Sequence, residues 1–321
     1  MKRTKFRDRR AVNPAMNFPT SKMVHLRDAT LEVFEAGKRG RPIVLCHGWP
    51  EHAFSYRHQI PALVDAGYHC IVPNQRGYGA SSRPAAVAEY DIHALTGDLI
   101  ALLDAFDYED AIFIGHDWGA IVVWNLALLH PSRVKAIANL SVPFRAREKS
   151  DPVAFWEEQL GDDFYIVHFN RKPGVAEALM EADVEGFLTK MYRTEQWLDA
   201  QSSMTMKFWE PTDGAGLPGR PMLTADEMAV FVEAFKRGGL VSPCHWYRNF
   251  TRNWERTIGV PQAISQPTLM IYGAYDSVPQ VDMTRFVPQA EIHVLACGHW
   301  IQQERPAETN QLLLAWLGAL D

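Results

Sequence analysis

One segment constrains the fold of this chain more than any other: residues 115–120, with the sequence GHDWGA. It follows an apolar run at 111–114 and precedes a second apolar run at 121–129. This pattern predicts a buried strand, a tight turn flanked by glycines, and a helix. Such a turn lifts its middle residue above the sheet beside the helix N-terminus, where backbone N–H groups favour negative charge. That middle residue is Asp117.

The residue type at position 117 determines which reaction the turn can support. A serine here attacks acyl groups, and water then cleaves the acyl ester. A serine that attacked a saturated carbon would form an ether, which water cannot cleave. A carboxylate that attacks a saturated carbon forms an ester, which can be hydrolysed at its carboxyl carbon. Asp117 therefore predicts ring opening or halide displacement at an sp³ carbon.

Strand and helix patterns alternate along most of the chain. Short apolar strands separated by helices are typical of a parallel sheet with both faces covered. The sequence therefore predicts an α/β fold with a mostly parallel sheet. Its expected elements are a hairpin at 22–36, strands at 43–46, 69–72, 111–115, 134–140, 268–273 and 291–295, and helices at 91–106 and 306–320.

The alternation stops between residues 145 and 257, where aromatic residues and helix formers predominate. We expect residues 145–257 to form a helical cap inserted into a core of residues 23–144 and 258–321. Open α/β folds bind ligands at the carboxyl ends of their strands, so we place the cap over these ends. Residues 1–22 are expected to be a solvated basic arm, with six Lys and Arg and one Asp in the first ten residues.

Hydrolysis of an ester on Asp117 requires a base, and two later residues form a candidate pair. Asp276 and His299 each come shortly after a predicted strand. Hydrolases with this turn have the order nucleophile, acid, histidine, and the carboxyl ends of parallel strands converge. Asp276 is expected to fix the tautomer of His299, which then takes a proton from water. The rival base and acid are His293, inside a predicted strand, and Asp282, further from a strand end.

Backbone donors beside Asp117 complete the expected site. The sequence HGWP at 47–50 follows a predicted strand, so the Trp49 N–H can donate to an oxyanion beside the Trp118 N–H. Donors of this kind contribute about 2.7–4 kcal/mol each when they point at developing charge.

Several short segments together give the chain a family resemblance. They resemble the soluble epoxide hydrolases of the α/β-hydrolase superfamily, and the similarity extends from Val24 onward. The resemblance implies an α/β-hydrolase fold and an enzyme that adds water to an epoxide, giving a vicinal diol through an ester on Asp117. The segments are HGWP at 47–50, RGYG at 76–79, GHDWGA at 115–120, PGVAEA at 173–178, HWYRNF at 245–250 and CGHW at 297–300.

The resemblance also implies two hydrogen-bond donors in the cap. Members of the family use two tyrosines that donate to the epoxide oxygen, and Tyr247 matches one of them. The segment YIVHF at 165–169 has His168 at the position of the other, so we expect His168 to be the second donor. If His168 packs within the cap instead, Tyr165 is the alternative. The resemblance further implies a cis peptide bond between Trp49 and Pro50.

Two other functions are compatible with parts of this pattern. Haloalkane dehalogenases share the Asp nucleophile and bind halide through the following Trp, here Trp118, but they lack the cap donors that Tyr247 matches. A non-catalytic small-molecule receptor on the same fold does not need Asp276 to hold His299.

Composition argues against several other classes of protein. The 321 residues are 47% hydrophobic and 22% charged, as expected for a globular protein with a full core. The net charge of −6 gives no reason to expect a nucleic-acid partner. No apolar stretch approaches the roughly 20 residues of a membrane span.

The same sequence gives no sign of a bound cofactor. The twelve histidines form no HExxH motif, and no phosphate-binding glycine motif is present, so we expect no metal and no cofactor. Four cysteines without CxxC spacing suit a reducing cytoplasm. The expected partners are a small hydrophobic epoxide and water, and the chain is expected to be a monomer or a homodimer.

Overall fold

The computed structural model describes residues 18–194, 207–211 and 216–320. Its main sheet has eight strands: β1 (Ser21–His25), β2 (Thr30–Ala36), β3 (Pro42–Cys46), β4 (His69–Asn74), β5 (Ala111–His116), β6 (Val134–Leu140), β9 (Thr268–Gly273) and β10 (Ala290–Leu295). Their order is β1-β2-β4-β3-β5-β6-β9-β10. Pairs β1–β2 and β2–β4 are antiparallel, and the other pairs are parallel. The prediction of a mostly parallel sheet is confirmed, and predicted strand ends differ by at most two residues.

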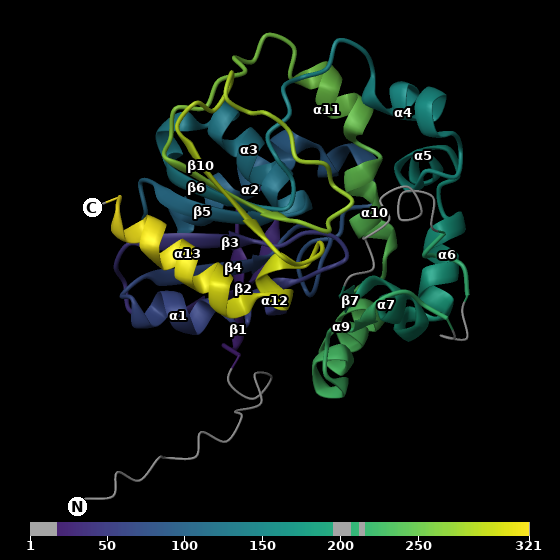
Figure 1. Cartoon of the computed structure of the whole chain (residues 1–321), viewed down its shortest axis with the longest axis horizontal. Helices are drawn as coiled ribbons and strands as arrows, with labels where there is room; N and C mark the ends of the chain where they lie inside the picture. The colour runs from purple at the N-terminus through teal and green to yellow at the C-terminus, as the bar shows by residue number, and fades with distance from the viewer. Residues whose placement is uncertain (1–17, 195–206, 212–215, 321) are drawn as a thin grey trace, which may run out of the picture.

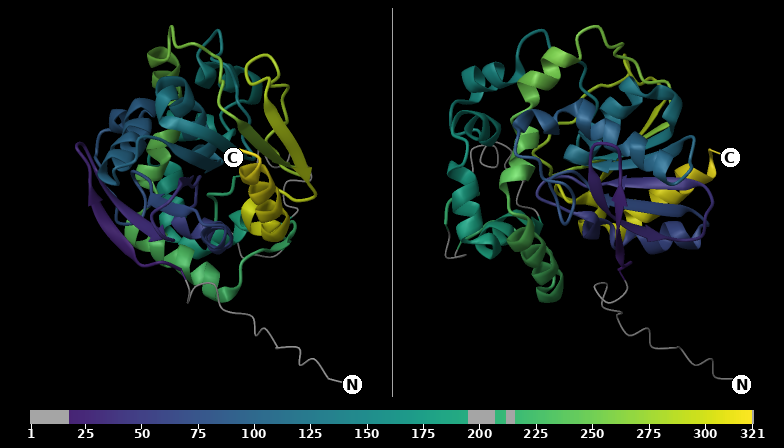
Figure 2. Two further views of the ribbon diagram at one scale, coloured as in Figure 1. Left: turned by 90° about the vertical axis from the view of Figure 1, so that its left-hand side faces the viewer. Right: turned by 180° about the vertical axis from the view of Figure 1, so that it is seen from behind.

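Helices cover both faces of this sheet (Figures 1 and 2). Helices α1 (Gln59–Asp65) and α13 (Pro306–Gly318) lie on one face, whereas α2 (Ile92–Ala105) and α3 (Trp118–Leu129) lie on the other. Successive strand residues point to opposite faces, so Ile43 and Leu45 pack with α1 and α13, and Val44 and Cys46 pack with α2 and α3. Burial on both faces explains the continuous apolar runs of the central strands.

The remaining core helices are short and connect these layers. They are η2 (Ala53–Tyr56), η3 (Val87–Tyr90), η4 (Pro131–Arg133) and α12 (Ile301–Glu304). Over the three described ranges, no helix has the length and hydrophobicity that a membrane crossing requires. The first 17 residues, which include the predicted basic cluster, lie outside the described part of the chain.

The described helices between β6 and β9 form a cap on one side of the core (Figure 1). They lie between residues 152 and 256, within the predicted insertion. The cap also contains the short strands β7 (Arg193–Thr194) and β8 (Arg220–Pro221), which pair with each other. The helices are α4 (Pro152–Leu160), α5 (Tyr165–Arg171), α6 (Val175–Ala182), α7 (Val184–Met191), α9 (Ala225–Gly238), α10 (Val241–Tyr247) and α11 (Phe250–Arg256).

Buried polar contacts join the cap to the core. Arg57 Nε of the core donates to Glu227 Oε1 of α9 at 2.7 Å, with both side chains buried. The Trp246 indole of α10 donates to the Arg76 carbonyl oxygen at 3.0 Å. Removing one partner of a buried ion pair leaves an uncompensated charge, at a cost of about 3–5 kcal/mol. The two contacts therefore fix the position of α9 and α10 over the carboxyl ends of the strands.

Candidate active site

Asp117 lies in the turn between β5 and α3, where its backbone has φ 50° and ψ −120°. L-residues rarely adopt these angles, and such strain is found mainly at functional sites. Two close approaches at this turn require glycine. A Cβ on Gly119 would lie 1.9 Å from the Cys46 carbonyl oxygen, and one on Gly48 would lie 2.5 Å from Asp117 Cβ. The predicted strand–turn–helix arrangement is present, with the carboxylate at the N-terminus of α3.

The structure brings the predicted acid and base to Asp117. His299 Nε2 lies 3.6 Å from Asp117 Oδ2. On the other side of the ring, His299 Nδ1 lies 3.1 Å from each carboxylate oxygen of Asp276. Asp276 follows β9 and His299 follows β10, so parallel strands deliver both residues to the same edge of the sheet. One ring nitrogen is thus held by a carboxylate while the other faces Asp117.

Buried charges set the protonation state of this group. Burial alone would raise the pKa of Asp276, but the His299 charge and several hydrogen bonds hold it below its ordinary value. Burial alone would lower the pKa of His299, but the carboxylates of Asp276 and Asp117 raise it well above its ordinary value. These charges therefore favour the imidazolium form of His299.

We expect Asp117→Asn to lower the pKa of His299, because it removes one of the two anions that raise it. A neighbouring opposite charge typically changes a pKa by about 1–3. Histidine ring resonances followed by NMR through a pH titration measure this change. Asp282→Asn is the matched control, since the Asp282 carboxylate accepts hydrogen bonds from Thr284 and lies away from His299. Equal His299 pKa values in the two variants would contradict the conclusion that the Asp117 charge raises the pKa of His299.

One of the two predicted backbone donors contacts the carboxylate of Asp117. The Trp49 N–H donates to Asp117 Oδ1 at 2.8 Å. The Trp49–Pro50 peptide bond is cis, which confirms that prediction. Trp118 is the first residue of α3, so its N–H is one of the first-turn donors that have no acceptor within the helix.

A buried pair that sequence reasoning missed, Glu51 and His116, joins two loops and a strand of the site. Glu51 Oε2 accepts the Gly48 N–H at 2.9 Å and lies 2.6 Å from His116 Nδ1. His116 Nε2 lies 2.8 Å from the His299 carbonyl oxygen. The pair therefore fixes the loop of Trp49, the strand before Asp117 and the loop of His299 relative to one another. The only sequence signal is that both residues are polar and lie next to predicted site residues.

A cavity of about 500 Å³, which includes space open to solvent, adjoins Asp117 and His299. Apolar walls with a few convergent polar groups suit a small apolar molecule with one polar centre. Besides Asp117 and His299, the lining residues are Trp49, Tyr165, Met191, Phe208, Tyr247, Ser277, Val278 and Trp300.

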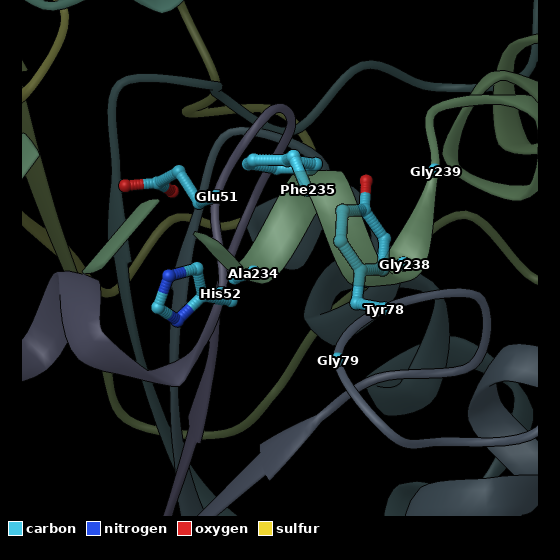
Figure 3. Close-up of a pocket in the computed structure, with 8 residues that line it drawn as sticks. All are labelled: Glu51, His52, Tyr78, Gly79, Ala234, Phe235, Gly238 and Gly239. Carbon is cyan, nitrogen blue, oxygen red and sulfur yellow. The ribbon is translucent and has the colours of Figure 1, made fainter. Parts of the chain in front are cut away.

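A second, smaller hollow lies between the core and the carboxyl end of α9 (Figure 3). Its walls include His52 and Tyr78 from core loops and Phe235 from α9. Neither Asp117 nor His299 lines this hollow, so the chemistry that the sequence predicts is confined to the larger cavity.

Two tyrosines of the cap face Asp117 across the larger cavity. Tyr247, the last residue of α10, lines it as predicted, and Tyr165, the first residue of α5, lines it beside Tyr247. Their ring centroids are 5.5 Å apart. Burial raises the pKa of both phenols above the ordinary value. Both hydroxyls therefore keep their protons at neutral pH and can donate hydrogen bonds.

His168, which the sequence predicts to face the substrate, is not among the residues that line the cavity. Its ring stacks on Trp209, with centroids 4.5 Å apart and 28° between the planes. Burial and the charge of Lys172 lower the pKa of His168 below the ordinary value, which disfavours the imidazolium. The cap packing of α5 places Tyr165 at the cavity instead.

The rival acid and base are both remote from this cavity. His293 pairs with Glu291 at 2.6 Å on β10, and the Asp282 carboxylate accepts hydrogen bonds from Thr284. Within the described part of the chain, no cluster of three or more His, Cys, Asp or Glu side chains could hold a metal ion.

Comparison with known families agrees with the fold. A family model described as alpha/beta hydrolase fold matches residues 41–306 of this chain. The chain belongs to the α/β-hydrolase fold family.

Similar proteins narrow this assignment. Epoxide hydrolase A of Mycobacterium tuberculosis is 41% identical, over 95% of this chain and 99% of the relative. Bifunctional epoxide hydrolase 2 of Sus scrofa is 34% identical over 87% of this chain, which spans about half (51%) of that relative. The crystal structure of epoxide hydrolase A from Mycobacterium thermoresistibile has a TM-score of 0.86 at 41% identity, covering 94% of this chain and 99% of that one. The protein is thus an enzyme of the epoxide hydrolase type.

Proposed function

We propose that Asp117 opens small apolar epoxides and that His299 then hydrolyses the resulting ester. The observation that carries this proposal is a carboxylate at the turn after β5, with a buried histidine on one side and two tyrosines across an apolar cavity. Formation of a diol from styrene oxide, lost in Asp117→Ala, is the direct test. Halide release from a bromoalkane without diol formation would instead support a dehalogenase, and neither product would support a receptor.

In the first step, an Asp117 oxygen attacks one epoxide carbon and forms a C–O bond. The bond from that carbon to the epoxide oxygen breaks, and its electron pair stays on the oxygen. Tyr165 and Tyr247 donate hydrogen bonds to this oxygen, and one of them transfers its proton as the alkoxide forms. Solvent restores the proton to the tyrosine, since the cavity is open to it.

Ester formation also prepares the second step. It removes the negative charge of Asp117, which is one of the two anions that raise the pKa of His299. His299 then releases its proton to the solvent that reaches the cavity and becomes a base for water. The water oxygen attacks the carboxyl carbon of Asp117, and the N–H groups of Trp49 and Trp118 stabilise the oxyanion. Collapse restores the carboxylate and expels the diol oxygen, which takes a proton from His299. With the Asp117 anion restored, His299 regains a proton from solvent and the cycle closes.

The surroundings of Trp118 argue against the dehalogenase alternative. The Trp118 ring packs against Trp246, Tyr247 and Phe250, with centroid distances of 5.7, 5.2 and 4.8 Å. Trp118 is not among the residues that line the cavity. The cavity instead presents two phenols, which suit a leaving oxygen that needs a proton.

The assignment of the two donors predicts different effects for two residues of α5. Tyr165→Phe should slow ring opening by about 100-fold, with the remaining activity carried by Tyr247. His168→Phe, three residues further along the same helix, should leave ring opening unchanged. Single-turnover alkylation measures this step separately from hydrolysis. A loss in His168→Phe together with normal alkylation in Tyr165→Phe would reverse the assignment.

We also propose a cytoplasmic location and a monomeric or homodimeric state. The four cysteines Cys46, Cys70, Cys244 and Cys297 are buried and unpaired, which suits a reducing compartment. Light scattering on the purified full chain determines the oligomeric state.

A further inference from the structure

Ser141 is the first residue after β6 and has an unusual backbone conformation. Its φ is 70°, in the left-handed region that favours glycine, asparagine and aspartate over serine. The residue is buried, and its N–H donates to the Ile271 carbonyl oxygen of β9 at 3.0 Å. In the sheet register, Leu140 lies opposite His116, so Ser141 follows β6 at the level where Asp117 follows β5. Sheet pairing therefore places this side chain at the active-site edge.

The Ser141 hydroxyl contacts both the acid and the base of the site. Ser141 Oγ donates to Asp276 Oδ2 at 2.6 Å and lies 3.0 Å from His299 Nδ1. A hydroxyl has one proton and two lone pairs, so it can donate to the carboxylate while it accepts the Nδ1–H of the imidazole. The Nδ1–H is thus shared between the two oxygens of Asp276 and the oxygen of Ser141.

Each carboxylate oxygen of Asp276 also has a separate anchor. Oδ1 accepts the Val278 N–H at 3.0 Å, and Oδ2 accepts the Ser141 hydroxyl. The two anchors hold the carboxylate so that both oxygens are equally distant from His299 Nδ1. Without the serine hydroxyl, Oδ2 loses its anchor and the carboxylate can rotate away from the ring.

We propose that Ser141 is a positioning residue for ester hydrolysis, which orients Asp276 and His299 together so that Nε2 faces the ester on Asp117. This inference rests on the proposed two-step function. Ser141 does not line the cavity, and its hydroxyl contacts neither Asp117 nor the two cap tyrosines. Loss of its hydroxyl should therefore slow hydrolysis and leave ring opening unchanged.

Two variants separate the hydroxyl from the backbone strain. Ser141→Gly and Ser141→Asn both tolerate a φ of 70°, but only asparagine provides a donor for Asp276. We expect Ser141→Gly to hydrolyse the alkyl-enzyme about 10- to 100-fold more slowly, with alkylation within about twofold of wild type. Alkyl-enzyme should accumulate during turnover, as seen by intact-protein mass spectrometry. Ser141→Asn should recover most of the hydrolysis rate.

If Ser141 only stabilised the fold, Ser141→Gly would not slow hydrolysis selectively. Equal losses of alkylation and hydrolysis in Ser141→Gly, or normal hydrolysis in that variant, would overturn the proposal. Thermal unfolding shows whether each variant is folded, and Ser141→Ala gives the same comparison if the glycine variant is not. The low-field Nδ1–H proton resonance of His299 should shift in the glycine variant, and an unchanged resonance would also count against the proposal. If the wild-type protein formed no alkyl-enzyme, the proposed function would fail, not the role of Ser141.

Discussion

Replacing His299 with glutamine should give an enzyme that is alkylated once and does not turn over. In the proposed mechanism, Asp117 attacks carbon without the help of a base, whereas attack of water on the ester requires one. Loss of a general base typically slows a step by about 10²–10⁴-fold. Intact-protein mass spectrometry after epoxide addition should show one adduct, and peptide mapping should place it on Asp117.

The matched control for this experiment is His293→Gln. His293 lies on β10 and pairs with Glu291 away from the cavity, so its replacement should leave turnover at the wild-type level. A His299→Gln protein that remained unmodified would refute the two-step mechanism. Normal turnover of His299→Gln would show that another group is the base.

The double variant Tyr165→Phe/Tyr247→Phe should lose ring opening almost completely, by about 10⁴-fold. The leaving oxygen of an epoxide is a strongly basic alkoxide, and these two hydroxyls are the phenols that line the described cavity. Phenylalanine keeps the ring packing, so the loss is chemical and not a collapse of the cavity wall. Single-turnover alkylation measures the effect, and intact-protein mass spectrometry should show no adduct.

Tyr275→Phe serves as the control for the double variant. Tyr275 is 40% exposed and is not part of the cavity wall, although it precedes Asp276. It should alkylate at the wild-type rate. A double variant that opened epoxides at more than about a tenth of the wild-type rate would show that another group protonates the oxygen.

The elements that carry Asp117, Asp276 and His299 could be predicted from local sequence patterns. Each residue follows a predicted strand, and the carboxyl ends of parallel strands meet at one edge of the sheet. The bounds of β6 and β9 agree with the predicted ones to the residue. The spacing of apolar residues and the residue types at turns are local features. They can therefore be recognised in a single sequence.

The proposed second cap donor, Tyr165, could not be predicted in this way. Tyr165 and His168 are three residues apart on α5, so they lie on neighbouring sides of one helix. Which of them faces the cavity depends on the rotation of α5, and the Trp209 ring that stacks on His168 belongs to a distant segment. Ser141 was missed for a similar reason, because its role depends on contacts with residues 135 and 158 positions away.

The division of the site between cap and core makes this enzyme modular. Both proposed proton donors for ring opening, Tyr165 and Tyr247, lie in the insertion, whereas the proposed nucleophile, base and acid lie in the core. Strands β6 and β9, on either side of the insertion, pair directly with each other. The insertion can therefore change in length or sequence without a change in sheet register. Evolution or engineering can therefore change the cap and so alter which epoxide binds. The core residues that hydrolyse the ester can stay the same.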